Sequence, residues 1–426
     1  MNPTTRPGPR LRHSFILLAV ACAAASLVGC STGSTGSARP ADGHWYRGNT
    51  HTHTLWSDGD AAPEHAIEWY AQNGYDFLVL SDHNILQDVE KWFPVAPGGR
   101  LTPEQVEGLR DRFGQGWTTL RFTSTGATEM RLKTLDELRE RFESRSFLLV
   151  TGEEVTDQFE GKPVHINAVN TSALLGPQGG SSVLDTIQRN LDAIDAHGEQ
   201  TGRPTLGHVN HPNFGWGITA AELASIRGEH FFEVYNGHRS VRNEGDADHP
   251  SLEAMWDHAL TVRLTTTGEL LYGLATDDAH NHFDADGHSV PGRGWVMVNA
   301  PRLNGDAIVE AMRRGDFYAS SGVELGSIEH DDGAYRIGIR AKPGVSYQTA
   351  FIGTRLDPDG EPGPEGEVLA VSEQNPAVYT YDGTELYVRA RVVSGEFHPR
   401  PYRQGDWQTA WTQPVSRAAA SRSEHK

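Results

Sequence analysis

Cysteine is almost absent from this chain, whose 426 residues include only Cys22 and Cys30. No run of eighteen apolar residues follows the first thirty residues, so no membrane-spanning helix is predicted there. Basic residues are outnumbered, because 37 Lys and Arg stand against 56 Asp and Glu, for a formal net charge of -19. This acid excess argues against a protein that wraps nucleic acid through broad phosphate contacts. It does not exclude an enzyme that cuts such bonds with bound metal.

The first thirty residues are typical of an export signal. Arg6, Arg10 and Arg12 precede an apolar run, 15–28, that is too short to span a bilayer comfortably. The run ends Leu-Val-Gly-Cys at Cys30, which resembles the lipobox of bacterial lipoproteins, whose cysteine is lipidated and becomes the mature N-terminus. The resemblance implies export and a lipid anchor at the periplasmic face or cell surface of a bacterial membrane. A plain secretory signal is the alternative.

Processing at this site would remove a signal peptide, residues 1–29. The mature chain would then begin with a flexible linker, residues 30–43. Processing would remove Cys22 and acylate Cys30, so no thiol would remain for a disulfide or a thiolate metal site. Any metal must then be held by histidine and carboxylate. The chain has 20 histidines, which is where a functional site is expected.

From residue 44 to about 300, short apolar runs end in polar, His-rich turns. Seven strands are predicted, at Trp45–Thr50, Phe77–Leu80, Phe147–Val150, Val164–Val169, Thr205–Val209, Phe231–Tyr235 and Leu271–Ala275. Helices are predicted between them at Pro63–Asn73 and at Val183–His197, the second of which Gly198 should end. Alternating strands and helices favour a mainly parallel α/β sheet, and seven strands favour a closed or nearly closed barrel.

Potential metal ligands accompany most of these strands. They are His51, His53, Asp58, Asp82, His83, Glu153, Glu154, His165, His208, His211, Asp277, Asp278 and His280. In barrel enzymes the loops at the carboxyl ends of the strands converge, so ligands distant in sequence can meet in one pocket. The clearest signal is His51-Thr52-His53, because alternation along a strand aims both imidazoles toward one ion.

These segments resemble the PHP (polymerase and histidinol phosphatase) metallohydrolases. The segments are GNTHTHTLWSDGD, YDFLVLSDHN, TGEEV with VHINAVN, GHVNHPN and ATDDAH. The resemblance covers about residues 44 to 320, and the first segment together with RRGDFYASSG looks most like the CehA/McbA-type branch. It implies a distorted seven-stranded (β/α) barrel over residues 44–321 with up to three metal ions.

Carried over by position, the family's metal ligands match nine residues of this chain. They are His51, His53, Asp58, His83, Glu154, His165, His211, Asp278 and His280. Glu153 stays an alternative to Glu154, and His208 to His211. The resemblance implies one ion held by His51, His53, Glu154 and Asp278, a second by Glu154, His165 and His211, and a third by Asp58, His83 and His280. Two or three ions of Zn, Mn or Fe would suit such mixed nitrogen and oxygen ligation.

Four further residues are candidates for a catalytic role. Asp82 and His208 stand beside the expected ligands and are candidates to protonate a leaving group. Arg239 and Arg293 are candidates to bind a phosphate or carboxylate of the substrate through two hydrogen bonds. Both arginines equally fit solvated surface residues.

Two segments lie outside the expected barrel strands. Residues 89–145 are an insertion with a helix at Leu135–Arg141, expected over the mouth of the barrel. Its Trp92, Phe93 and Trp117 suit either a pocket lining or a small core of the insertion itself. Residues 322–412 show alternating patterns that predict an antiparallel β-sandwich, with a structural or docking role by default and carbohydrate or surface binding second. A disordered tail, 413–426, is expected to follow.

The sequence therefore predicts an exported metallohydrolase in which metal-activated water attacks a phosphoester, since the family that it resembles acts mostly on phosphomonoesters and phosphodiesters. The alternative is a carbamate or carboxylic ester hydrolase, to which the CehA/McbA-type resemblance points. An arginine beside the ions would favour phosphate, and an aromatic pocket without one would favour the alternative. A surface binding lipoprotein with structural metal is a third hypothesis. The expected partners are a small-molecule or phosphoester substrate and a membrane, with no broad nucleic-acid-binding surface.

Overall fold

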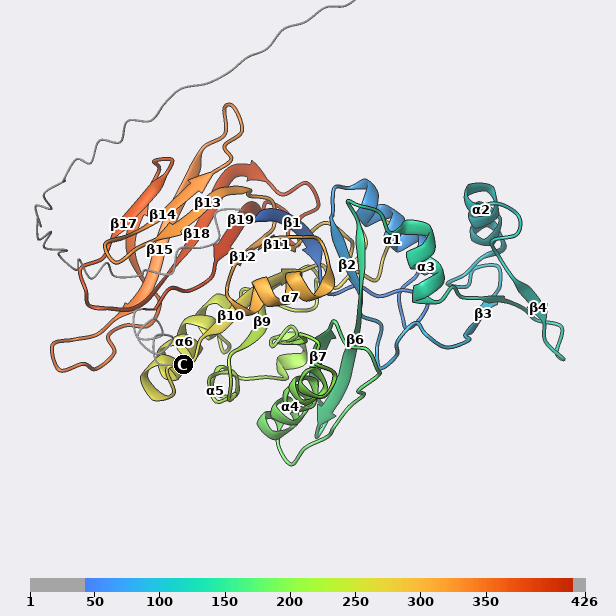
Figure 1. The fold of residues 1–426 in the computed structure, drawn as a ribbon, viewed down its shortest axis with the longest axis horizontal. Helices are drawn as coiled ribbons and strands as arrows, with labels where there is room; N and C mark the ends of the chain where they lie inside the picture. The colour runs from blue at the N-terminus through green and yellow to red at the C-terminus, as the bar shows by residue number, and fades with distance from the viewer. Residues whose placement is uncertain (1–42, 417–426) are drawn as a thin grey trace, which may run out of the picture. The chain divides into compact units, whose positions relative to one another are not determined.

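The computed structural model describes residues 43–416, and all seven predicted strands are present (Figure 1). They are β1 (His44–Asn49), β2 (Phe77–Leu80), β6 (Leu148–Phe159), β7 (Lys162–Val169), β8 (Leu206–Val209), β9 (His230–Asn236) and β10 (Leu271–Thr276). The predicted signal peptide and lipobox lie outside the described residues. Among the helices that are described, none is long and apolar enough to cross a membrane.

The seven strands form part of one mixed sheet, in the order β10-β9-β8-β7-β6-β2-β1. The prediction of a mainly parallel sheet is wrong at β7, which pairs antiparallel with both β6 and β8. Only Glu160 and Gly161 join β6 to β7, with φ angles of 49° and 80° that suit the tight turn of a two-residue hairpin. No crossover helix fits into two residues, so the chain must reverse direction there.

The first and last strands of this series meet without a strand ladder. Just beyond their carboxyl ends, His53 N donates to Ala279 O over 2.9 Å and Asp278 N donates to His51 O over 3.0 Å. Within residues 43–416 no ladder pairs β10 with β1. The edge of β1 that does not pair with β2 pairs with β11 (Trp295–Ala300). The architecture is therefore mixed α/β, and its hydrogen bonds do not resolve the closed or nearly closed barrel that was predicted.

Helices connect many of these strands. They are α1 (Pro63–Gln72), α4 (Val183–Thr201), η1 (Phe214–Trp216), α5 (Ala220–Ala224), α6 (Leu252–Thr266) and α7 (Gly305–Arg313). The predicted end of α4 at Gly198 is wrong, because the helix continues to Thr201 and ends at Gly202, whose φ is 66°. Gly198 serves close packing instead, since a Cβ there would lie 2.5 Å from Thr205 Oγ1.

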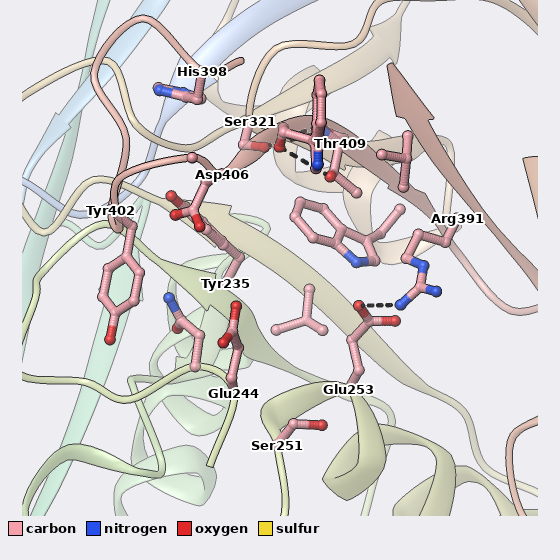
Figure 2. A pocket seen from close by; sticks show the side chains of 16 residues that line it. Tyr235, Glu244, Ser251, Glu253, Ser321, Arg391, His398, Tyr402, Asp406 and Thr409 are labelled. Carbon is pink, nitrogen blue, oxygen red and sulfur yellow. Dashed lines mark hydrogen bonds and ion pairs between the residues drawn. The ribbon is translucent and has the colours of Figure 1, made fainter. Parts of the chain in front are cut away.

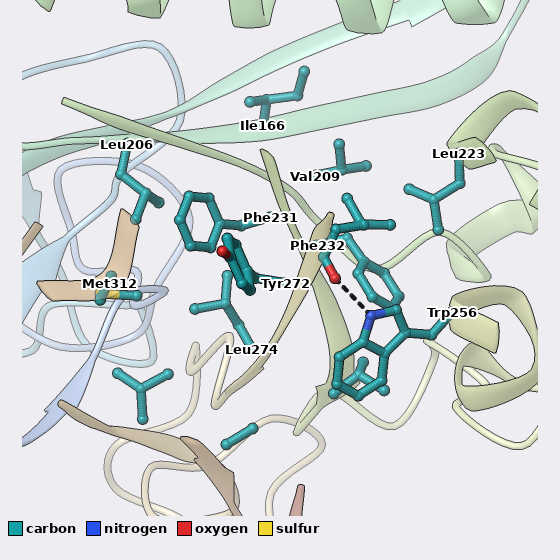
Figure 3. Packing of buried hydrophobic residues seen from close by; sticks show 14 of the residues in the cluster. Ile166, Leu206, Val209, Leu223, Phe231, Phe232, Trp256, Tyr272, Leu274 and Met312 are labelled. Atoms are coloured by element: carbon teal, nitrogen blue, oxygen red, sulfur yellow. Dashed lines mark hydrogen bonds between the residues drawn. The ribbon is translucent and has the colours of Figure 1, made fainter. Parts of the chain in front are cut away.

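The largest apolar core includes residues of α4 and α6 and of strands β7 to β10 (Figure 3). Trp256 of α6 is fully buried in this core, packs against Phe232 and donates Nε1–H to Leu271 O over 2.8 Å. An indole that buries roughly 150–250 Å² contributes about 4–6 kcal/mol at about 25 cal/mol per Å². This packing fixes β8, β9 and β10, whose carboxyl ends carry polar residues.

The insertion, residues 89–145, forms β3 (Trp92–Val95), α2 (Pro103–Phe113), β4 (Leu120–Phe122), β5 (Thr128–Arg131) and α3 (Leu135–Phe142). Phe93 belongs to a local core that also holds Trp56, whereas Trp92 lies under Arg121 and Trp117 donates to Glu64. Arg100 donates to the carbonyls of Ser57 and Gly59. The insertion therefore packs on the loop that follows β1.

The C-terminal strands continue the main sheet. They are β12 (Phe317–Ser320), β19 (Trp407–Thr412), β18 (Glu385–Phe397), β15 (Tyr347–Arg355) and β16 (Glu367–Ser372), in sheet order after β11. A second sheet of β13 (Leu325–His330), β14 (Ala334–Ile339) and β17 (Ala377–Thr380) shares an apolar core with them. Two antiparallel layers are thus present, one of them continuous with the sheet of the N-terminal part. Val415, in the predicted tail, still exchanges backbone hydrogen bonds with Val388.

Candidate metal centre

Histidines and carboxylates converge at the ends of the strands, in four overlapping groups. In each group one potential ligand atom per residue lies within 4.8 Å of the others. The groups are His53, Asp58, His83 and His280; His51, His53 and Asp278; His51, Glu154 and His211; and His83, Glu154 and His165. All nine residues that the family resemblance singled out therefore lie together. The grouping of the ligands differs from the expected one. His165 and His211 were expected to hold the same ion, but they fall in separate groups.

Two residues of the cluster have an unusual backbone conformation. The φ angle is 27° at His211 and 49° at Asp278, a region that residues other than glycine adopt infrequently. Such strain persists only where the surroundings impose it, and it concentrates at functional sites. At Asp278 the backbone N–H donates to His51 O, which ties the two strand ends together.

The potential metal-ligand atoms of the cluster face one another at short distances. His51 Nε2 and His53 Nε2 lie 3.1 Å apart, and they lie 3.3 and 3.2 Å from Asp278 Oδ1. Glu154 Oε2 is buried 2.7 Å from His83 Nδ1 and 3.4 Å from His53 Nε2. Lone pairs that converge in this way need protons or metal ions between them. Imidazole and carboxylate ligands of this kind fit divalent Zn, Mn or Fe.

The electrostatics of the cluster divide its members. Against the effect of burial, the neighbouring carboxylates raise the pKa of His51, His83, His211 and His280, so these rings hold protons that bound cations would replace. Glu154 and His53 are held in the forms that bind metal. Burial alone would raise the pKa of Glu154, but the imidazoles of His51 and His83 hold it well below its ordinary value. Burial, together with the nearby His280, lowers the pKa of His53 to about 3. An ionised carboxylate and a neutral imidazole are the ligand forms of these side chains.

Glu233 of β9 is a site residue that the sequence analysis missed. Its Oε1 accepts from His51 Nδ1 over 2.7 Å and from Thr276 Oγ1 over 2.8 Å. Its Oε2 accepts from His211 N over 2.8 Å and from Asn236 Nδ2 over 2.7 Å. Because His51 donates through Nδ1, its Nε2 lone pair faces the cluster. The available signal was a lone carboxylate inside the apolar run Phe-Phe-Glu-Val-Tyr.

The variant Glu233→Gln is expected to weaken metal binding by about 10–100-fold. All four partners of Glu233 are donors, so the NH2 group of a glutamine would face at least one of them. Competition with a chromogenic chelator measures the affinity, and Glu310→Gln on the exposed face of α7 is the control. An affinity of Glu233→Gln equal to that of the control would contradict the orienting role.

Asp82 and His208, the predicted proton donors, lie beside the cluster but in none of the four groups. Asp82 is buried and accepts from Thr54 N, Ser57 Oγ and Gln87 Nε2, so it holds the loop between His53 and Asp58. The ring of His208 lies 6.3 Å from that of His51 and is fully buried. Burial lowers the pKa of His208 to about 4, which keeps the ring neutral.

The two predicted anion-binding arginines are engaged with the backbone. Arg293 is 1% exposed and donates to the carbonyls of Gly237, Gly287, His288 and Arg400. Arg239 donates to the carbonyls of Tyr402 and Asp286. Arg293 is therefore neither a solvated surface residue nor a group free to bind a substrate, because loop carbonyls surround its guanidinium.

One side of the cluster is open to solvent. The side chain of Asp58 is 55% exposed, and those of His83 and His280 are 25% and 20% exposed, whereas those of His51 and His53 are fully buried. His238, which the sequence analysis also missed, has its ring 5.6 Å from that of His280. Its Nδ1 accepts from Ser240 N, so a neutral ring carries its proton on Nε2.

Fold and site together define a mixed α/β protein with a buried His/carboxylate cluster. The chain is similar to a two-domain protein of Bacteroides vulgatus that is described as containing a PHP-like metal-dependent phosphoesterase. The identity is 14% and the TM-score is 0.38, and the match covers 88% of this chain and 96% of that chain. It is also similar to a protein of Bifidobacterium adolescentis described as a metal-dependent phosphoesterase, at 14% identity and a TM-score of 0.28, with 65% and 96% covered. An amidohydrolase of Chromobacterium violaceum with bound sulfate shows 14% identity and a TM-score of 0.27, with 55% and 87% covered. No family model and no curated protein matches the chain.

Proposed function

We propose that this protein is a metal-dependent hydrolase that cleaves phosphomonoester or phosphodiester bonds with water. The observation that carries the proposal is the overlap of the four ligand groups, in which His51, His53, His83 and Glu154 each belong to two. A structural ion takes a closed set of ligands of its own, whereas groups that share ligands suit two or three neighbouring ions. Divalent ions in such a centre supply a water of lowered pKa and a Lewis acid for the substrate oxygen.

The residues of the chain orient the centre and handle protons. Glu233 fixes the ring of His51, and Asp82 fixes the loop that carries Asp58. Substrate approaches from the open side, where Asp58 is exposed. The ring of His238 lies beside that of His280, and its Nε2–H can donate a hydrogen bond to a leaving oxygen.

A carbamate or carboxylic ester is the second candidate substrate, and one observation favours it. Arg293 and Arg239 both donate to backbone carbonyls, so neither acts as a dedicated phosphate clamp. Phe214, whose ring lies 5.1 Å from that of His211, supplies an aromatic surface beside the cluster. A neutral aryl ester would need no arginine there.

The test is hydrolysis of a chromogenic panel by the metal-loaded full chain. The panel holds p-nitrophenyl phosphate, bis-p-nitrophenyl phosphate, p-nitrophenyl acetate and an aryl carbamate, with His53→Ala as the blank. Cleavage of a phosphoester that disappears in His53→Ala is the expected result. Cleavage of the acetate or carbamate alone would replace the first candidate by the second. Equal rates in the wild type and His53→Ala would overturn both.

A further inference from the structure

Two exposed aromatic rings stack on each other at the end of the β18–β19 hairpin, among C-terminal strands that contribute none of the four ligand groups. Phe397 and Trp407 are direct cross-strand partners, with ring centroids 4.2 Å apart and an interplanar angle of 21°. They are 60% and 45% exposed. A contiguous apolar patch rimmed by polar groups marks a binding surface, whereas single exposed apolar residues are ordinary.

Trp407 borders two cavities. The first, of about 400 Å³, is lined by residues of β9, α6 and the loop 398–406 (Figure 2). The second, of about 650 Å³, is lined by residues within 339–348, 373–375 and 393–395. Both volumes fall in the range of roughly 300–1,000 Å³ that is usual for small-molecule sites. A ligand stacked on Trp407 therefore has both cavities within reach.

The walls of these cavities combine flat rings with hydrogen-bonding groups. Figure 2 shows Tyr235, Asp406 and Glu244 on one wall of the first cavity and Glu253 with Arg391 on another. The second cavity is lined by the amides of Gln348, Gln374 and Asn375 and by hydroxyl groups. An acyl chain in this place would displace water from the amides of Gln348 and Gln374, which is costly.

Several of the charged groups of this surface are already paired. Glu253 lies 3.2 Å from Arg391 and 3.1 Å from Arg389, and Glu244 lies 2.5 Å from Arg403. Lys342 lies 2.6 Å from Glu396 at the edge of the second cavity. Asp406 has no cation but accepts from Arg403 N over 2.6 Å. Because Glu253, Glu244 and Glu396 each have a cation, little unpaired charge remains on this surface, which favours a ligand without net charge.

We infer that Phe397, Trp407 and the two flanking cavities form a binding site for a neutral oligosaccharide. A sugar ring has an apolar C–H face that stacks on an aromatic ring and a rim of hydroxyls that bond to amides and carboxylates. Several linked sugar units would extend from the aromatic platform into the cavities that Trp407 borders. The site would hold the protein on a glycan independently of the metal centre.

The test uses calorimetry of the full chain with neutral hexasaccharides of glucose, mannose, galactose, xylose or N-acetylglucosamine. Polygalacturonate and choline serve as the anionic and cationic probes. At least one neutral hexasaccharide should bind, and Trp407→Ala should weaken that binding by about tenfold or more, as expected for a lost stacking face. Trp407→Phe should retain most of it, as should Phe122→Ala, the control at another exposed aromatic residue.

Hydrolysis at the metal centre should be unchanged in Trp407→Ala, which also shows that the variant is folded. Failure of every neutral hexasaccharide to bind overturns the inference. Binding that Trp407→Ala leaves intact, or binding of only polygalacturonate or choline, overturns it as well. None of these results bears on the proposed hydrolase, because Trp407 is in none of the ligand groups.

Discussion

Glu154→Gln is expected to reduce hydrolysis by about a thousandfold or more and to lower the bound metal measured by elemental analysis. Glu154 belongs to two of the four ligand groups, and its Oε1 lies 3.1 Å from His165 Nδ1 and 3.4 Å from His211 Nε2. A glutamine keeps the shape of the side chain but removes the charge that neighbouring cations require. One substitution therefore weakens two sites at once, with little change in packing.

Glu153→Gln is the matched control, because it makes the same chemical change one residue earlier on β6. Successive residues of a strand point to opposite faces, and Glu153 Oε1 accepts from Leu175 N over 2.6 Å, away from the cluster. This variant should keep its metal content and rate. Loss of activity in Glu153→Gln with full activity in Glu154→Gln would reverse the assignment of the two glutamates.

Arg389→Leu is expected to lower the free energy of unfolding by about 3–5 kcal/mol. Arg389 of β18 is 1% exposed and donates Nε and Nη2 to Asp257 of α6 over 2.8 and 2.7 Å. Tyr387 donates to the same carboxylate over 2.8 Å. Without the guanidinium, Asp257 would remain a buried charge with only neutral donors. The pair joins a helix of the N-terminal part to a C-terminal strand.

Urea unfolding of Arg389→Leu, followed by circular dichroism, measures this effect through the midpoint and slope of the transition. Arg336→Ala removes an arginine from an exposed ion pair with Asp331, 2.7 Å long, and should cost less than about 1 kcal/mol. Equal losses in the two variants would mean that burial adds nothing to the Arg389 pair.

Local patterns in the sequence predicted much of the fold. The seven strands are short apolar runs bounded by polar residues, and the structure has strands at all seven places. The prediction of strand three failed at its end, because it stopped at Val150 while β6 continues to Phe159. Thr151, Glu153 and Glu154 interrupt the apolar pattern, and Glu154 faces the site and not an apolar core. Missing that extension also concealed the Glu160–Gly161 turn, and with it the antiparallel β7.

The sequence by itself determined which residue types gather, because histidines and carboxylates at strand ends are visible as motifs such as His51-Thr52-His53. Only the tertiary structure decided which of two alternative ligands faces the cluster, because strand pairing sets which face of a strand points inward. It placed Glu154 and His211 in the groups, and Glu153 and His208 outside them. It also buried Arg293 among carbonyls and brought Glu233 to His51 across 182 positions of sequence. Contacts between residues so distant along the chain depend on packing, which no local pattern records.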